Sequence, residues 1–402
     1  MMLGAFRQAG VFREQLDDSA EKHEDQIPET WLNREKLKRL AFHAFYLDVT
    51  LYFLCGHRPT LRYEDLNLTS PCSEQLWEAM TLDGWKQTMA IELGKRTTMK
   101  FVDYIDQAMD PERRPGLPYL VEDEYLYGLC AMQAWIHRDA NNGRCWMPSG
   151  LPVPTRGASH PTGSAWSATY WATQLDSWRT KYEIDKPTGM ILSSRLHAEV
   201  IDMNAMSLYH LSQLELRVDL KRITELSAAE SSGSNVSRRK IESSMVEWAA
   251  TPDARWALWH AAQVVKLWRE RVGHGDGNDG ITVEHAQPRI GLPALTALYE
   301  AGLTIWAYTR SIQACGSCVM GSSLQATRST ARPFDVFQGR KDHSFLSWVK
   351  HGGRESFDGS IVCACRAGQL IQYCQSGLTY GSRHWQCGYQ MAAKLSRLRD
   401  DQ

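Results

Sequence analysis

The sequence has almost no net charge and lacks the long apolar runs of a membrane protein. Its 402 residues contain 45 Lys and Arg against 46 Asp and Glu, which gives a formal net charge of −1. A chain with this balance has no electrostatic signature for binding nucleic acid or an anionic surface. The unbroken apolar runs are too short to span a bilayer, so we expect no membrane partner.

Recognisable catalytic patterns are also missing. The sequence contains no G-x-S-x-G nucleophile turn, no H-E-x-x-H zinc motif, no phosphate-binding loop and no dinucleotide fingerprint. It shows no period-two alternation of any length, which favours an all-α fold over one with a sheet. The N-terminus lacks the basic-then-apolar order of a secretory signal, so we expect the ten Cys to be reduced thiols of a nuclear or cytosolic protein.

The most informative segment is a helix that we predict from about residue 29 to residue 55. Its apolar residues recur at helical spacing on two stripes, which is typical of a helix enclosed by others. Asp48 falls on one stripe, where a carboxylate needs an ion pair or a capping contact, with Arg39 and Arg58 as candidate partners. Gly56 and Pro59 then end the helix.

Several short motifs follow this helix in a fixed order. Glu64 to Leu68 reads Glu-Asp-Leu-Asn-Leu, and Pro71 to Trp77 reads Pro-Cys-Ser-Glu-Gln-Leu-Trp, with Ser73 as a helix N-cap. Together with the aromatic helix and the turn at Gly56 to Pro59, they resemble the regulatory ("middle homology", xylanolytic-activator-like) domain of fungal zinc-finger transcription factors. The residues that carry the resemblance are expected to define the fold: Arg39, Asp48, Gly56, Arg58, Pro59, Leu66, Leu68, Pro71 and Trp77.

The resemblance implies a nuclear regulator of RNA polymerase II transcription, without catalysis. It implies a large, irregular helical domain over residues 1–310. In this family, DNA is contacted through an N-terminal zinc-binding module, and no run of residues here has that module's spacing. DNA binding, zinc and other cofactors are therefore not expected of this chain. The expected partners are a small-molecule effector, transcriptional co-regulators and a second copy of the chain.

An effector could bind between the helices of such a domain. The candidate lining residues are aromatic: Phe45, Tyr52, Trp135 and Tyr209. The same residues at helical spacing also suit an ordinary core. A non-DNA-binding helical scaffold and an all-α metal-dependent enzyme are the alternative functions.

Residues 311–402 differ in character from the rest. They hold six of the ten Cys among scattered Gly and Ser, and their periodicity is weak. We therefore predict a poorly structured, Cys-containing C-terminal tail.

Three groups of residues could hold a metal ion, and each also has a simpler explanation. Cys315 and Cys318 form a C-x-x-C pair that Cys363, Cys365 or His343 could complete, although free thiols are favoured. A second group, Asp103 and Asp106, lies one helical turn apart, as on a solvated helix face. The third, Asp276 to Gly280, lacks the spacing of a calcium loop and reads as a Gly-rich turn.

Overall fold

The chain forms two compact helical units, Met1–Ala205 and Met206–Gln402. The computed structural model describes residues 2–12, 27–56, 58–95, 99–110, 112–118, 122–142, 163–189, 195–232, 235–272, 290–312, 334–338, 341–357 and 360–400. The units meet in sequence within one helix, after Ala205, and the predicted domain end at residue 310 stays a prediction.

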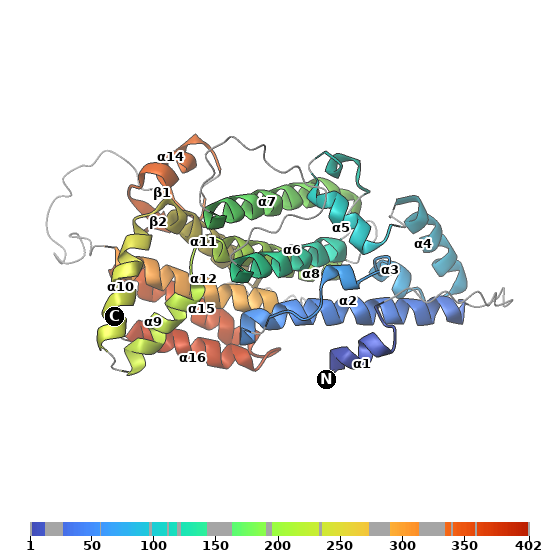
Figure 1. The fold of residues 1–402 in the computed structure, drawn as a ribbon, viewed down its shortest axis with the longest axis horizontal. Helices are drawn as coiled ribbons and strands as arrows, with labels where there is room; N and C mark the ends of the chain where they lie inside the picture. Colours follow the sequence, from blue (N-terminus) through green and yellow to red (C-terminus); the bar gives the residue numbers. More distant parts are fainter. Residues whose placement is uncertain are drawn as a thin grey trace, which may run out of the picture. The chain divides into compact units, whose positions relative to one another are not determined.

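The first unit is built around three long helices. Helix α6 (Glu122–Asn142) lies between α2 (Glu29–Cys55) and α7 (Gly163–Gly189) (Figure 1). The shorter elements are α1 (Met2–Gln8), η1 (Tyr63–Asp65), α3 (Glu74–Trp77), α4 (Leu82–Lys95), α5 (Phe101–Met109) and η2 (Arg114–Gly116). Helix α8 (Arg195–Glu215) begins in this unit and continues into the second.

Aromatic side chains fill the core of the first unit. Phe42 of α2 packs edge-on against Phe101, with ring centroids 5.0 Å apart. Tyr125 of α6 stacks on Tyr182 of α7 at 4.0 Å. The indole N–H of the buried Trp178 donates to the Tyr125 carbonyl at 3.1 Å. The aromatic residues therefore join α2, α6 and α7 into one core.

Helix α2 is less enclosed than its sequence predicts. The face with Ala41, Phe42 and Phe45 is fully buried, in agreement with the apolar stripes. Leu40 and Leu51 belong to the apolar residues for which the two stripes predict an enclosed helix, but they are 41% and 44% exposed. The described elements of this unit cover only part of the helix surface, so an apolar residue at helical spacing can still face solvent.

The second unit surrounds helix α12 (Leu292–Ser311), which is buried along almost its whole length. It packs against α9 (Leu220–Ser232), α10 (Asn235–Ala249), α11 (Pro252–Val272), α15 (Ala364–Gly381) and α16 (Cys387–Asp400). Helix α14 (His343–His351) packs on α11. Three short strands, β1 (Phe334–Asp335), β2 (Glu355–Phe357) and β3 (Ser360–Ile361), pair parallel and then antiparallel. Because these strands are only two or three residues long and the other described elements are helices, the all-α class is confirmed.

The C-terminal segment departs from the prediction of a poorly structured tail. Its described residues form α14, α15 and α16, and α15 packs closely on α12. The contact surface includes glycines: a Cβ at Gly377 would lie 2.7 Å from Leu298, and one at Gly381 would lie 2.5 Å from Leu295. Because small residues form part of this buried face, its hydrophobic periodicity is weak. No described helix has both the length and the apolar character that crossing a bilayer requires.

Gly128 lets α6 approach the indole of Trp178. An ideal Cβ at this position would lie 2.1 Å from Trp178 Cζ2, and the buried ring cannot easily move. We expect Gly128→Ala to lower the free energy of unfolding by roughly 1–3 kcal/mol, through overpacking. Chemical denaturation measures the change. Gly4→Ala, where a Cβ meets nothing within 4 Å, is the matched control. Equal stabilities of the two variants would contradict the close contact.

His137 makes the first unit sensitive to acid. Its ring lies 3.4 Å from that of Tyr52, and burial lowers the pKa of His137 from 6.5 to about 3. Between pH 6.5 and about pH 3, His137 is therefore protonated in the unfolded chain and neutral in the folded chain. We expect unfolding to become easier as the pH falls below 6.5, by up to about 1.4 kcal/mol per pH unit from this group. His137→Gln should flatten this slope in denaturation series, with His43→Gln as a control. An unchanged slope would refute the assignment.

Candidate functional site

One carboxylate of α2 fixes the chain just after the helix ends. Asp48 Oδ2 accepts hydrogen bonds from the backbone N–H groups of Thr60 at 2.6 Å and Leu61 at 2.7 Å. The predicted Arg partner is wrong: Arg58 is exposed, and no ion pair within the described residues joins Asp48 to Arg39 or Arg58. The capping contact, which the sequence left as the alternative, is the one that forms, because two backbone donors lie within reach.

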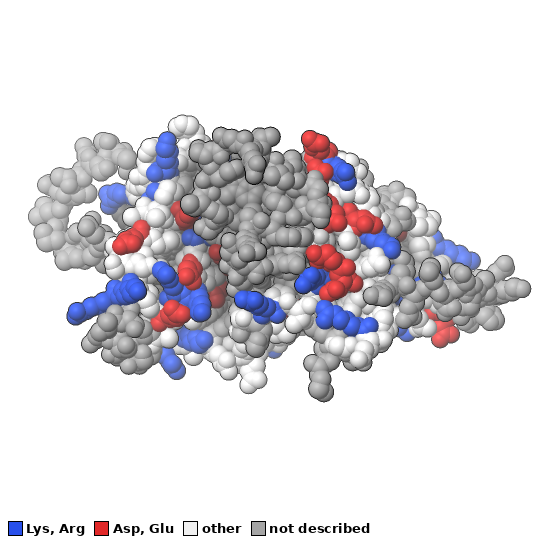
Figure 2. Space-filling view, in the orientation of Figure 1, with Lys and Arg blue, Asp and Glu red and all other residues white. Residues whose placement is uncertain are grey.

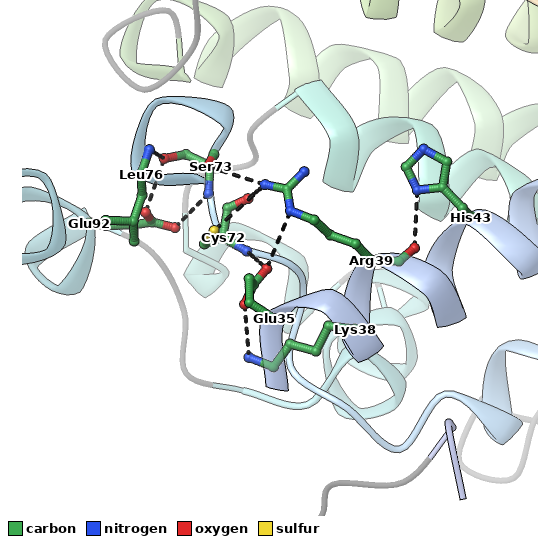
Figure 3. Close-up of polar contacts among 8 residues, drawn as sticks. All are labelled: Glu35, Lys38, Arg39, His43, Cys72, Ser73, Leu76 and Glu92. Carbon is green, nitrogen blue, oxygen red and sulfur yellow. Dashed lines mark hydrogen bonds and ion pairs between the residues drawn. The ribbon is translucent and has the colours of Figure 1, made fainter. Parts of the chain in front are cut away.

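A second contact, nearly two helical turns from the start of α2, holds the corner at Cys72 and Ser73. Glu35 is 2% exposed, and its Oε1 accepts the N–H of Cys72 at 2.5 Å (Figure 3). Arg39, one turn further along, donates to the carbonyls of Cys72 at 2.9 Å and Ser73 at 3.4 Å. Glu35 and Arg39 also pair with each other at 3.8 Å. Glu35 thus binds a backbone N–H of this corner, and Arg39 binds its backbone carbonyls.

Helix α4 contributes a third carboxylate from the opposite side of this corner. Glu92 accepts the N–H of Ser73 at 2.9 Å and its hydroxyl at 3.0 Å (Figure 3). The Ser73 hydroxyl oxygen in turn accepts the N–H of Leu76 at 3.2 Å, which confirms Ser73 as the N-cap of α3. We call Asp48, Glu35 and Glu92 the three clamp carboxylates.

The remaining motif residues shape the same segment. Gly56 adopts a left-handed conformation, with φ of 66°, and its N–H donates to Tyr52 at 2.7 Å. Leu66 and Leu68 are buried in the core, and the Trp77 ring lies 4.6 Å from the Arg39 guanidinium. Pro71 is buried and Pro59 half-buried. Most of the motif therefore serves to fix one loop on α2.

A small cavity of about 160 Å³ lies beside this corner. Its lining includes the acidic residues Glu35 and Glu92 and the thiol residue Cys72, together with other polar residues and apolar ones: Lys38, Thr69, Ser70, Trp31, Leu76, Met89 and Leu93. Burial, assisted by the Glu35 charge and opposed by Arg39, raises the pKa of the Cys72 thiol to about 12. The thiol is therefore protonated and a poor nucleophile. The carboxylates of this site accept backbone N–H groups and so hold the corner at Cys72 and Ser73 in place.

Comparison with known proteins identifies this region. Residues 6–107 match the family model of the fungal specific transcription factor domain. Over this segment the chain is similar to that domain. The segment contains all three clamp carboxylates, and the resemblance predicted from the motifs is confirmed over these residues.

Two curated proteins of Schizosaccharomyces pombe match over 55 residues, or 14% of this chain. Zinc finger protein klf1 is 38% identical there, and zinc finger protein zas1 is 36% identical. The matched stretch spans only 7% and 6% of these relatives' own lengths. No solved structure matches the chain.

The predicted effector residues do not line the cavity beside Cys72. Within the matched segment, Phe45 is fully buried, and Tyr52 contacts the His137 ring. Outside it, Trp135 packs edge-on against Tyr63 at 4.8 Å, and Tyr209 belongs to the second unit. Their role in binding an effector stays a prediction.

The candidate metal ligands are placed as follows. Asp103 and Asp106 are both exposed on α5, and Asp106 accepts the hydroxyl of Tyr63 at 2.7 Å. Cys315, Cys318, and Asp276 to Gly280 lie outside the described residues. Within the described ranges, no three His, Cys, Asp or Glu side chains gather as a metal site.

Sequence reasoning missed Glu35 and Glu92 as members of the site. Glu35 could have been noticed, because it precedes Arg39 by four residues on one helix face. Glu92 carries no such signal, since its partner Ser73 lies 19 residues earlier in another element.

The contact made by Asp48 predicts a loss of stability when its carboxylate is removed. Asp48→Ala leaves the N–H groups of Thr60 and Leu61 without their acceptor, and we expect a loss of about 1–3 kcal/mol in the free energy of unfolding. Thr60→Ala is the matched control, because it removes only the longer hydroxyl contacts at 3.2 and 3.3 Å. Thermal and chemical denaturation distinguish the two. A wild-type stability for Asp48→Ala would show that this contact contributes nothing.

Proposed function

We propose that this chain supplies the regulatory helical region of a nuclear regulator of RNA polymerase II transcription, and that it acts by binding rather than by catalysis. The observation that supports the proposal is the match of residues 6–107 to the fungal specific transcription factor domain, a segment in which Glu35, Arg39 and Glu92 hold Cys72 and Ser73. No resident cofactor is part of the proposal.

The chemistry of the clamped corner supports a non-enzymatic role. The clamp carboxylates Glu35 and Glu92 are 2% and 6% exposed, and both accept backbone N–H groups. A carboxylate used in this way is held in place, and its oxygens are occupied by donors of the chain itself. The raised pKa of Cys72 likewise makes this thiol a poor nucleophile.

The charge distribution favours a role in which another module or partner contacts DNA. Among the described residues on the face seen in Figure 2, basic and acidic side chains lie intermingled. The formal net charge is −1. The relatives klf1 and zas1 are named zinc finger proteins, and in the proposal it is such a module that binds zinc and DNA. This chain then contributes contacts to co-regulators, to an effector or to a second copy.

A tethering experiment tests the proposal. Residues 1–402 are fused to a heterologous DNA-binding module in a fungal cell that carries a reporter transcribed by RNA polymerase II. We expect the fusion to raise or lower reporter transcript relative to the module alone, and the unfused, fluorescently tagged chain to collect in the nucleus. The destabilised variant Gly128→Ala should lose the effect, and the control Gly4→Ala should keep it. A wild-type fusion that is present in the nucleus at equal amount and leaves transcript unchanged would contradict the proposal.

A further inference from the structure

A second cavity lies within the second unit and differs in chemistry from the one beside Cys72. Its volume is about 290 Å³, near the lower end of the range for small-ligand sites. Arg255 of α11, Tyr308 of α12 and Glu355 of β2 line it from three elements. The loop at Gly352 to Arg354 forms another wall, and Ile312 and Val362 add apolar surface.

Arg255 is a buried cation whose hydrogen bonds go to neutral groups. Arg255 is only 8% exposed to solvent. Nε donates to the carbonyl of Val349 at 2.7 Å, Nη1 to that of Ala250 at 3.1 Å, and Nη2 to that of Lys350 at 3.4 Å. A guanidinium has about five N–H donors, so roughly two remain for another acceptor. Within the described residues, no carboxylate forms an ion pair with Arg255, whose hydrogen bonds go to carbonyls. Burying a positive charge without a paired anion costs free energy, and a bound anion would lower that cost.

Glu355, the acidic residue of the cavity lining, is hydrogen-bonded to Tyr308. Its Oε1 accepts the hydroxyl of Tyr308 at 2.7 Å, and the residue is 7% exposed. Burial raises the pKa of Glu355, against the opposing effects of the Tyr308 hydrogen bond and the Arg255 charge. Glu355 and Arg255 both line the cavity and their charges interact, but within the described residues no ion pair joins them.

Two consecutive glycines keep the space beside the guanidinium open. Gly352 and Gly353 have φ of 74° and 136°, values that favour glycine. A Cβ at Gly352 would lie 3.5 Å from Arg255 Nη1, so a side chain at this position would occupy space beside the guanidinium. The exposed Arg354 follows directly and adds a second positive charge at the rim.

We propose that this cavity binds a small organic anion through a carboxylate group. The carboxylate oxygens accept the remaining N–H donors of Arg255, a pairing that the planar guanidinium fork suits. Arg354 strengthens the attraction from the rim. Ile312 and Val362 contact the carbon skeleton of the ligand. This inference is independent of the proposed transcriptional role, because binding is measured directly on the chain and transcription is not part of the readout.

The test is isothermal titration calorimetry of the full chain with acetate, succinate and benzoate, and with neutral succinamide as the matched control. We expect at least one carboxylate to bind at concentrations below roughly 10 mM, and succinamide to bind at least about tenfold more weakly than succinate. The inference is overturned if no carboxylate binds in this range, if succinamide matches succinate, or if inorganic phosphate binds and the carboxylates do not.

Variants locate the binding at this cavity. Arg255→Met removes the charge while keeping much of the side-chain length, and it should weaken carboxylate binding by at least about tenfold. Arg222→Met, at an exposed arginine paired with Asp219 at 3.3 Å, should bind as the wild type does. Since Arg255 also holds three carbonyls, Ile312→Trp provides a second route: it fills the cavity and leaves Arg255 in place. Wild-type affinity in a folded Ile312→Trp variant would overturn the assignment, whatever the fate of Arg255→Met.

Discussion

Backbone N–H groups that leave a helix and enter a loop need acceptors, and in the first unit the clamp carboxylates provide them. Asp48 and Glu35 come from α2, and Glu92 comes from α4. Because each carboxylate receives a peptide N–H from the connecting chain, the loop after Gly56 follows α2 back toward its N-terminal end. The start of α3 and the cavity beside Cys72 both depend on this arrangement, since Ser73 serves as N-cap and clamp partner at once. Removing any acceptor would leave a polar group in a partly dry environment.

The sequence predicts the parts of this fold that are governed by local rules. The extent of α2, its end at Gly56, the N-cap at Ser73 and the all-α class all follow from helical spacing and capping chemistry. The partner of Asp48 could not be predicted in the same way. Asp48 accepts hydrogen bonds from backbone N–H groups, and because almost every residue carries one, the sequence does not mark which of them will bind. Glu92 was missed for a related reason: its contact depends on how α4 packs, and no spacing rule encodes that.

The C-terminal helices show a different limit of sequence reasoning. Hydrophobic periodicity detects large apolar residues, whereas α15 meets α12 through Gly377 and Gly381, which have no side chain to count. Close approach of two helices is favoured by such residues, but the same residues weaken the helical signal. The cavity around Arg255 is likewise built from α11, α12 and a loop near β2, so only the folded chain brings its residues together.

The chemical state of Cys72 has a consequence for how this thiol reacts with oxidants. Oxidants and electrophiles attack the thiolate form of cysteine, and with a pKa of about 12 only a minute fraction of Cys72 is a thiolate near neutral pH. The sulfur instead lies 3.6 Å from Arg39 Nη2 as a weak acceptor. The corner at Cys72 and Ser73 therefore holds a protonated thiol, which reacts slowly with oxidants that require the thiolate.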